Sequence, residues 1–511
     1  MAEPSKPVTD YIKKILEARV YDVAVQSPLD KMVRLSQRLD CSVLLKREDL
    51  QPIFSFKIRG AYNRIARLSL DARKRGVICA SAGNHAQGVA LSAHRLGIVA
   101  TIVMPVTTPP IKIDAVRYWG GKVVLHGDTF DEAYAHARAL ESQEDLTFVH
   151  PYDDPDVIAG QGTVGMEILH QHPEPIEAVF VPIGGGGLAA GVSAYIKYLR
   201  PETKVIGVEP VDAASMTAAL HAQERVILNR VGLFADGVAV RQAGAETYRL
   251  CKDLLDGTIT ADTDEMCAAI KDIFEDMRVI AEPAGALALA GLKTYAAQNP
   301  TRAGALIAIN SGANMNFDRL RHVAERAEVG EEREILLGVT IPEEIGSYRR
   351  FIQVLGNQTV TEFNYRYATG QEANVFVGIR LRDARTEKAQ ILAQLTALRY
   401  KVVDMSANES AKLHVRYMVG GRAPDLQDEV LLRFEFPERP GALMKFLDGV
   451  GGDWSITLFH YRNHGADYGR VLAGLQVPLA ERERFFEKLA LLGYPYEDET
   501  DNPAYQMFLS R

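Results

Sequence analysis

The chain has 511 residues, of which 47% are hydrophobic and 24% charged, and its formal net charge is −8. This length exceeds what one hydrophobic core usually supports, so two or more domains are expected. The acidic balance argues against nucleic acid or an anionic membrane surface as the main partner. No apolar run reaches the roughly 20 residues that a membrane helix needs.

The cysteines and the N-terminus bear on where the protein works. Cys41, Cys79, Cys251 and Cys267 are scattered without the paired spacing of a metal site, which is typical of reduced thiols in a cytosolic protein. The first residues lack a secretory apolar core, and acidic residues there count against a transit peptide. The sequence therefore predicts a cytoplasmic protein.

The first 310 residues alternate between short apolar runs and amphipathic stretches. Strands are predicted at residues 42–46, 77–80, 100–104, 122–126, 178–183, 204–209 and 305–309. Helices are predicted from residue 11, after a cap at Thr9 or Asp10, at residues 60–68, 86–96, 111–119 and 129–141, and from the glycine run to residue 198. Strands and helices that alternate at these lengths indicate parallel sheets covered on both faces.

A single lysine, Lys57, lies in the apolar and aromatic segment 51–61, which reads QPIFSFKIRGA. An apolar setting lowers the pKa of a lysine because the ammonium loses hydration, and the neighbouring cation Arg59 is expected to act in the same direction. A neutral amine is the form that condenses with an aldehyde to a Schiff base. Lysines at helix starts are mostly solvated, so this segment alone does not identify a site.

Four consecutive glycines, Gly184 to Gly187, stand between a predicted strand and a predicted helix. Their backbone amides can crowd around an anion, and the helix N-terminus adds a favourable dipole. Phosphate binding is therefore favoured over a mere tight turn. The run also matches a dinucleotide-binding fingerprint, with Glu209 as the ribose-binding acid, although four glycines satisfy almost any glycine pattern.

Two further polar loops follow predicted strands. In residues 81–85, SAGNH, Asn84 could donate to a ring hydroxylate or cap the next helix, and His85 is interpreted as structural. Residues 311–314, SGAN, form a turn or a second ligand loop. Ligands in open α/β sheets bind beyond the carboxyl ends of strands, where Asn84, the glycine run and Ser311 are expected, whereas Lys57 is expected to precede its helix.

These four stretches, in this order, resemble the fold-type II family of pyridoxal 5′-phosphate (PLP) enzymes, and within it the threonine/serine dehydratases. Residues 55–61 match the cofactor-lysine motif, 81–85 the asparagine loop, 184–188 the phosphate loop and 311–314 the pyridine-facing serine. The resemblance implies PLP as cofactor and a two-lobed α/β catalytic domain with parallel sheets at residues 1–328. The implied site residues are Lys57, Asn84, Gly184, Gly185, Gly186, Gly187, Leu188 and Ser311.

The roles that the resemblance implies agree with the chemistry of these side chains. Lys57 would hold the cofactor as an imine and then remove the Cα proton as a general base. Asn84 would donate to the ring oxygen, while the glycine amides would neutralise the phosphate. Ser311 would meet the pyridine nitrogen with a neutral hydroxyl, which leaves a weaker electron sink than a carboxylate would and suits elimination of a β-hydroxyl.

The tail after a charged linker at residues 329–334 contains an internal repeat. Pro342 and Pro437 are 95 residues apart, as are Gly346 and Gly441, and Phe351 and Phe446, whereas Tyr365 and Tyr461, and Gly378 and Gly474, are 96 apart. Each copy is predicted to form a β-α-β-β-α-β unit of about 75 residues. The expected domains are ACT-like α+β regulatory units at residues 335–407 and 430–501.

With this tail, the whole chain resembles the biosynthetic threonine deaminases (threonine ammonia-lyases). The resemblance implies deamination of L-threonine to 2-oxobutanoate and ammonia, inhibition by isoleucine, the end product of the pathway, and opposition by valine. It also implies serine as a secondary substrate and a homotetramer. Tyr365 and Tyr461 are the candidate effector contacts, because a tyrosine offers an apolar ring and a polar hydroxyl, with an interface or core role for each left open.

Two departures and three other interpretations complete the prediction. Ala82 stands where serine racemases of this family have a serine, so racemisation is disfavoured. Ser215 stands where some relatives have an acid for a divalent cation, so no metal is expected.

Another fold-type II lyase or synthase, such as threonine synthase, is disfavoured by the tail. A nucleotide-dependent dehydrogenase leaves Lys57 and Ser311 unexplained, and the intact Lys57 disfavours a silent amino-acid sensor.

Overall fold

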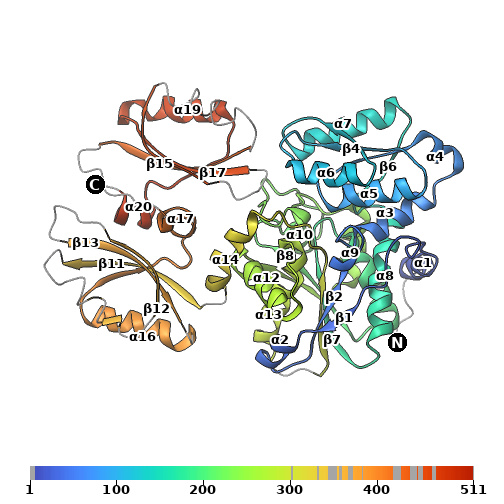
Figure 1. Cartoon of the computed structure of the whole chain (residues 1–511), viewed down its shortest axis with the longest axis horizontal. Coiled ribbons are helices and arrows are strands. Elements are labelled where there is room, and N and C mark those ends of the chain that lie inside the picture. Colours follow the sequence, from blue (N-terminus) through green and yellow to red (C-terminus); the bar gives the residue numbers. More distant parts are fainter. Residues whose placement is uncertain are drawn as a thin grey trace. The chain divides into compact units, whose positions relative to one another are not determined.

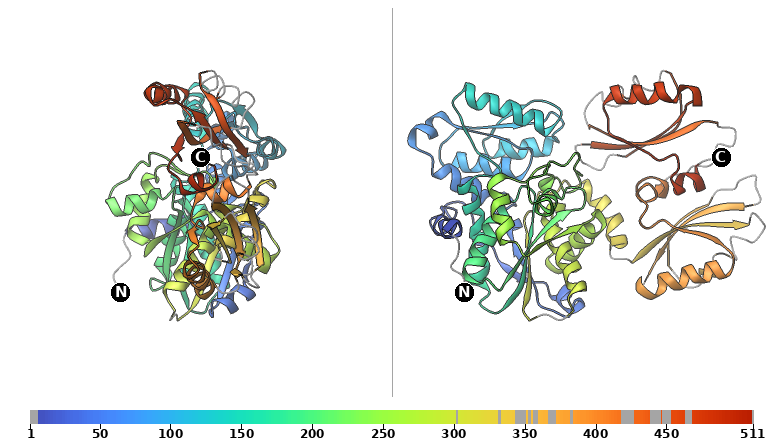
Figure 2. Two further views of the ribbon diagram at one scale, coloured as in Figure 1. Left: turned by 90° about the vertical axis from the view of Figure 1, so that its left-hand side faces the viewer. Right: turned by 180° about the vertical axis from the view of Figure 1, so that it is seen from behind.

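Met1–Ala327 and Glu328–Arg511 form two separate units (Figures 1 and 2). The structure is a computed structural model that describes residues 6–300, 303–330, 333–342, 351, 354–355, 359–365, 372–381, 384–417, 427–437, 446, 453–462 and 468–509. No helix within these residues is long and apolar enough to cross a membrane.

The larger sheet of the first unit has the strand order β1-β2-β10-β7-β8-β9, and only the β1–β2 pair is antiparallel. Its strands are β1 (Leu29–Lys31), β2 (Val43–Arg47), β7 (Ile176–Pro182), β8 (Lys204–Pro210), β9 (Gly257–Ala261) and β10 (Ala305–Asn310). In β7, Ala178 and Phe180 pack into one hydrophobic core, and Val179 and Val181 pack into another. Both faces of the sheet are therefore buried, as expected for parallel strands.

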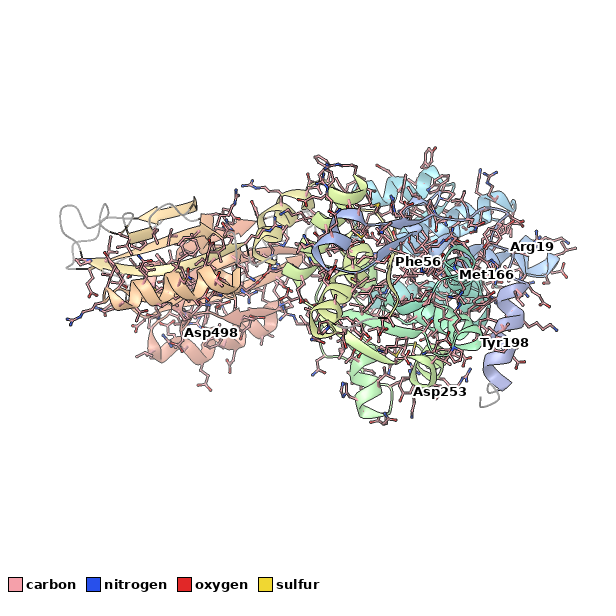
Figure 3. The ribbon with its side chains drawn as sticks, turned by 90° about the horizontal axis from the view of Figure 1, so that it is seen from below. Arg19, Phe56, Met166, Tyr198, Asp253 and Asp498 are labelled. Carbon is pink, nitrogen blue, oxygen red and sulfur yellow. The ribbon has the colours of Figure 1, made fainter. Side chains whose placement is uncertain are left out.

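Helices cover the two faces of this sheet as separate layers (Figure 1). One layer contains α2 (Val33–Arg38), α12 (Thr263–Met277) and α13 (Pro283–Gln298), and the other contains α1 (Lys6–Leu16), α8 (Pro155–Gln171), α9 (Gly187–Leu199) and α11 (Ala245–Leu254). Phe56, which precedes Lys57, and Met166 pack against the core under the second layer (Figure 3). Helices α8, α11, α12 and α13 were not among the predicted elements.

A smaller parallel sheet, in the order β5-β4-β3-β6, forms the second lobe of the first unit. Its strands are β3 (Val77–Ala80), β4 (Ala100–Met104), β5 (Lys122–Leu125) and β6 (Thr147–Phe148), and its helices are α3 (Lys57–Ala66), α4 (Leu70–Arg75), α5 (Asn84–Arg95), α6 (Pro110–Tyr118) and α7 (Phe130–Gln143). Thr129 and Glu132 form a capping box that sets the start of α7. The predicted strands of both sheets are confirmed to within two residues.

Three predicted helix starts are wrong. Helix α1 begins at Lys6, so Thr9 and Asp10 lie inside it. Helix α5 begins at Asn84, with Gly83 at the N-cap position. Helix α3 begins at Lys57, so this lysine opens its helix and does not precede it.

The physical reason for the error in α3 is the packing of Gly60. A Cβ atom at Gly60 would lie 2.4 Å from Gln161 Nε2 and 2.8 Å from the carbonyl oxygen of Val157, both on α8. The glycine therefore lies within α3, despite its low helix propensity, because only a residue without a side chain lets α8 approach this closely.

The second unit contains two antiparallel sheets of one topology, β12-β13-β11-β14 and β16-β17-β15-β18. The first repeat is built from β11 (Glu334–Pro342), β12 (Thr359–Tyr365), β13 (Glu372–Arg380), α16 (Ala384–Ala397) and β14 (Lys401–Asp404), and the second from β15 (Glu429–Pro437), β16 (Ser455–Arg462), β17 (Tyr468–Gln476), α19 (Arg482–Leu492) and β18 (Tyr496–Asp498). Phe351 and Phe446 are both fully buried. The predicted duplication is confirmed, while Gly346 and Gly441 lie outside the described residues.

The two tyrosines predicted as effector contacts occupy equivalent backbone positions. Tyr365 lies opposite Val375 in the first sheet, and Tyr461 lies opposite Val471 in the second. The register of β12 shifts between residues 360 and 362, and that of β16 shifts between residues 456 and 458, also at equivalent positions. The side chains of Tyr365 and Tyr461 lie outside the described part of the chain.

The two repeats share a hydrophobic core. Leu336 and Phe376 of the first repeat belong to the same buried cluster as Leu431 and Leu472 of the second. The short helices α17 (Glu409–Leu413) and α20 (Pro503–Phe508), one after each repeat, contribute to this cluster. The predicted linker is shorter than expected, because α14 (Arg319–Gly330) runs into it and β11 begins at residue 334.

Candidate active site

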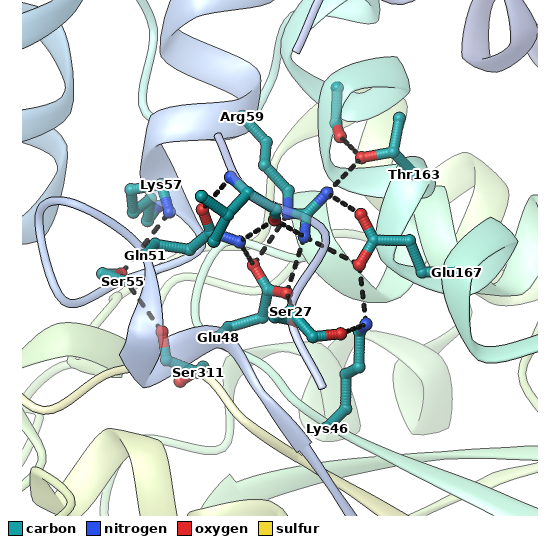
Figure 4. A network of polar contacts seen from close by, with 12 residues as sticks. Ser27, Lys46, Glu48, Gln51, Ser55, Lys57, Arg59, Thr163, Glu167 and Ser311 are labelled. Atoms are coloured by element: carbon teal, nitrogen blue, oxygen red, sulfur yellow. Dashed lines mark hydrogen bonds and ion pairs between the residues drawn. The ribbon is translucent and has the colours of Figure 1, made fainter. Parts of the chain in front are cut away.

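The segment before Lys57 is bound to the loop after β10. Ser55 forms an isolated antiparallel bridge with Gly312, and its hydroxyl donates to the carbonyl oxygen of Ser311 at 3.1 Å. The amide of Phe56 donates to the same oxygen at 3.2 Å. These contacts join segments about 250 residues apart in sequence and bring the predicted cofactor lysine and pyridine-facing serine into one region (Figure 4).

Lys57 is held in a setting that favours its neutral form. Its Nζ donates to the carbonyl oxygen of Pro151 at 2.9 Å and lies 5.3 Å from the centre of the Phe56 ring. Burial lowers the pKa of Lys57 from 10.5 to about 8, against the opposing effect of the negative charge of Glu282. A far larger fraction of this amine is therefore neutral near physiological pH than of an ordinary lysine.

Arg59 does not lower this pKa, and that part of the prediction is wrong. Its guanidinium is fully buried and donates to Glu48 at 2.7 and 2.8 Å and to Glu167 at 2.6 and 3.0 Å. Lys46 Nζ donates to the second oxygen of Glu167 at 2.6 Å, so two cations meet two anions (Figure 4). The negative charges of Glu48 and Glu167 neutralise Arg59, and the network links α3 to α8 and to the end of β2.

Asn84 is held at both ends of its side-chain amide. Its Nδ2 donates to Glu282 Oε1 at 2.6 Å, and its Oδ1 accepts from Asn314 Nδ2 at 2.6 Å. Asn84 is therefore not a helix cap, which was the alternative prediction. Glu282 and the role of Asn314 were missed in the sequence. The available signals were the Glu-Pro pair that opens α13 and the last residue of the SGAN loop.

The glycine run packs against Tyr152 and opens helix α9. A Cβ atom at Gly185 would lie 2.2 Å from Cγ of Tyr152, and Gly186 has a φ of +95°. The hydroxyl of Thr247 donates to the carbonyl oxygen of Gly185 at 2.6 Å. Since Pro151 contacts Lys57 and Tyr152 contacts the loop, one dipeptide links the lysine to the glycines.

These residues fit a cofactor that carries a phosphate and an aldehyde. The N-cap Gly186 offers no side-chain oxygen to the first amides of α9, so these amides remain for an anion. The glycines would let the backbone approach that anion closely, and a half-buried amine with a lowered pKa is suited to bind an aldehyde.

Comparison with known proteins covers nearly the whole chain. Residues 20–312 match the family of pyridoxal-phosphate dependent enzymes, and residues 325–415 and 420–509 match the C-terminal regulatory domain of threonine dehydratase. The chain is 59% identical over 504 residues to the biosynthetic L-threonine dehydratase of Burkholderia multivorans. This alignment covers 98% of this chain and 99% of that protein. The chain belongs to the biosynthetic threonine dehydratases.

Other threonine dehydratases and solved structures agree with this assignment. The biosynthetic enzyme of Escherichia coli is 56% identical over 502 residues, 98% of this chain and 97% of that protein. Threonine deaminase isoform 2 of Solanum lycopersicum aligns with a TM-score of 0.62 and 52% identity over 63% of this chain and 94% of that one. Maize serine racemase aligns with a TM-score of 0.58 and 29% sequence identity, over 62% of this chain and 96% of that one. This threonine dehydratase is thus a PLP-dependent lyase with a regulatory region.

Two other candidate residues of the threonine dehydratase have structural partners. The Glu209 carboxylate accepts from the amides of Met216 and Thr217 at 2.8 and 2.7 Å, and from the Thr217 hydroxyl at 2.6 Å, which caps α10 (Ser215–Ala222). This bonding leaves no support for Glu209 as a ribose-binding acid. His85 Nε2 bonds to the carbonyl oxygen of Val149 at 2.9 Å, and burial lowers its pKa to about 3, so the ring is neutral. No group of three or more metal-ligating side chains was found within the described residues.

Proposed function

We propose that this threonine dehydratase deaminates L-threonine to 2-oxobutanoate and ammonia, with Lys57 as cofactor anchor and proton acceptor. The observation that carries the proposal is the half-buried Lys57 amine, which donates to the carbonyl oxygen of Pro151 and has its pKa lowered to about 8. The names of the relatives with more than half of their residues identical support threonine as the substrate. Serine is proposed as a secondary substrate.

Each residue of the site has a task in this reaction. When bound, PLP supplies an electron-withdrawing ring that stabilises negative charge at Cα. The amides of the glycine run and Leu188, at the N-terminus of α9, would hold its phosphate, Asn84 its ring oxygen and Ser311 its ring nitrogen. Lys57 in its neutral form takes the proton from Cα. The β-hydroxyl leaves as water, which accounts for the proton removed from Cα, and the resulting enamine reacts with water to give the 2-oxo acid and ammonia.

The test is an assay of 2-oxo acid formation from threonine and from serine. The protein loaded with PLP should be yellow and absorb at about 410 nm if Lys57 holds the cofactor. It should release 2-oxobutanoate from threonine, and more slowly pyruvate from serine. Loaded protein that releases ammonia from neither amino acid would contradict the proposal, and conversion of another hydroxyamino acid derivative would favour the lyase or synthase alternative.

The glycine run yields a prediction with a matched control. Gly185→Ala should weaken the binding of PLP at least about tenfold, which corresponds to 1.4 kcal/mol, because the new Cβ would overlap the Tyr152 ring. Gly257→Ala is the control, since no atom lies within 4 Å of its added Cβ. The measurement is a PLP titration of the apo-protein by absorbance. Equal affinities of the two variants would show that the loop does not hold the phosphate.

We further propose that the duplicated unit binds isoleucine and valine, that isoleucine inhibits the enzyme and that valine opposes it. The two repeats share one topology and one register, as duplicated effector sites would require. Their common core, which contains Leu336 and Leu431, offers a route by which one repeat can affect the other. For isoleucine to inhibit, it must favour a low-activity state, typically by 1–3 kcal/mol of coupling. Family resemblance also supports a homotetramer.

Tyr365→Ala and Tyr461→Ala are expected to weaken the response to isoleucine. Both residues lie at equivalent places near the ends of β12 and β16, so each would contribute to a related site. Threonine turnover without effector should stay close to that of the parent, because both residues lie in the second unit. The measurement is an isoleucine titration of turnover, with exposed Leu491→Ala as the control. Parent-like inhibition in both variants would exclude these tyrosines as effector contacts.

A further inference from the structure

Glu282 occupies the N-cap position of α13 but does not cap this helix. A side chain at this position normally accepts hydrogen bonds from the first amides of its own helix, whereas Glu282 makes no such bond. Its carboxylate instead accepts a bond from Asn84 Nδ2, and only 5% of the residue is exposed. Burying a carboxylate without bonds to the first amides of its own helix costs free energy. Its bond to Asn84 therefore suggests a function for this placement.

Glu282 and Asn314 together select one orientation of the Asn84 amide. Asn314 Nδ2 donates to the backbone carbonyl oxygen of Ile53 at 2.7 Å, and this unambiguous acceptor fixes which end of Asn314 faces Asn84. Asn84 therefore accepts from Asn314 through Oδ1 and donates to Glu282 through one N–H. An amide nitrogen carries two N–H groups, so one remains for a ligand.

The carboxylate lies at the meeting point of several segments of the site. A Cβ atom at Gly312 would lie 2.6 Å from Glu282 Oε1 and 3.3 Å from Asn84 Nδ2. The amide of Glu282 donates to the carbonyl oxygen of Gly312 at 3.1 Å. Gly312 in turn pairs with Ser55, two residues before Lys57. Glu282 is thus bound on both sides to segments that hold predicted cofactor ligands.

We propose that Glu282 is a positioning residue for the dehydratase reaction, which holds the Asn84 amide so that its remaining N–H binds the oxygen of the cofactor ring. The inference rests on the proposed function, because Asn84 has a ring to bind only if PLP occupies the site. The ionised carboxylate enforces the orientation, since it can only accept a hydrogen bond. A protonated Glu282 can also donate, so either orientation of the amide would satisfy it and the restraint weakens.

Burial and the surrounding charges set the pKa of Glu282, and therefore its protonation, near neutral pH. Burial and then the negative charge of Asp236 raise the pKa of Glu282 to about 7, against the effects of its other partners. The charged side chains that act on it or respond to it come from four elements: Asp236 in η2 (Asp236–Val238), Lys112 in α6, Arg319 in α14 and Lys57 in α3. The activity that depends on Glu282 should therefore fall as the pH drops through about 7.

Three variants separate the charge of Glu282 from its shape. Glu282→Gln mimics the protonated acid, so its kcat/KM should lose the inflection that Glu282 causes near pH 7 and keep only the fall that Lys57 causes below about pH 8. Glu282→Asp keeps an ionisable carboxyl group and should retain the fall, which for one titrating proton is about tenfold per pH unit at most. Asn314→Ala removes the other restraint and should lower kcat about 10- to 100-fold, the cost of a misplaced group.

A second measurement does not depend on activity. In full-length protein labelled with ¹⁵N-asparagine, with and without PLP, the side-chain signals of Asn84 are identified by their absence in Asn84→Asp. The proton donated to Glu282 should shift as the pH drops through about 7 in the parent, and the shift should be absent in Glu282→Gln. Glu282→Gln has nearly the same shape as the parent residue, so it is expected to fold like the parent and to allow this comparison.

Two results would overturn the proposal. One is a Glu282→Gln variant with the pH profile of the parent, which is what a merely structural role predicts. The other is a pair of Asn84 signals that do not respond to pH in the parent. Failure of the proposed function gives a different pattern, in which loaded protein deaminates no substrate at any pH while the Asn84 signals still follow Glu282.

Discussion

Replacing Lys57 with alanine should reduce threonine turnover at least about 1,000-fold, since general acid–base catalysis alone contributes 10²–10⁴ and the variant also loses the cofactor anchor. Lys57→Arg should lose as much, because a guanidinium keeps the charge but does not deprotonate. The exposed Lys74→Ala is the matched control and should behave like the parent. The measurement is steady-state formation of 2-oxobutanoate. Activity of either Lys57 variant above a thousandth of the parent would contradict the role.

The loss of activity in Lys57→Ala should not come from unfolding. The pKa of Lys57 is about 8 in the folded chain against an ordinary 10.5, so between these values the unfolded chain binds more protons. The free energy of unfolding of the parent without PLP should therefore gain a contribution as the pH rises from 8 to 10.5, and the variant should lack it. At neutral pH the variant should be at least as stable as the parent, because it no longer buries an ammonium group. Thermal unfolding at several pH values tests both statements.

Arg59→Met should destabilise the first unit by about 3–5 kcal/mol, the cost of removing one partner from a buried ion pair. The change leaves the buried carboxylates of Glu48 and Glu167 with Lys46 as the remaining cation of the network. The chain has two tryptophans, one in each unit, so a Trp454→Phe background leaves Trp119 as the reporter for the first unit. Urea unfolding followed by Trp119 fluorescence then measures the loss.

A double variant tests whether the network acts as a unit. Arg59→Met combined with Glu167→Gln leaves one buried cation, Lys46, and one buried anion, Glu48. Its free energy of unfolding should be higher than the sum of the single losses predicts, because the charges balance again. A loss below about 1 kcal/mol in Arg59→Met would contradict a buried, matched network and would be typical of a solvated pair. Strict additivity would mean that the two sites do not interact.

The amino-acid sequence predicted most strands of the first unit, the order of the motifs and the duplication, but not β1, β6 or β9. Each depends on information that is local or periodic. A buried parallel strand is a short apolar run, a phosphate loop needs glycines between strand and helix, and a duplication repeats its spacing. The α/β fold was predicted on this basis, whereas the roles of the four stretches around Lys57, Asn84, Gly185 and Ser311 were implied by their resemblance to the fold-type II PLP enzymes.

The tertiary structure decided which side chains meet and which charges are matched. The sequence suggested that Arg59 would lower the pKa of Lys57, but Glu167, 108 residues away, neutralises it. Asn84 was open to a role as a helix cap until Glu282, 198 residues away, was found on its amide. The predicted helix start at Gly60 is wrong, because α3 begins at Lys57 and Gly60 is required where α8 approaches it. Contacts across such separations leave no periodic trace in the chain, because they depend on how whole elements pack.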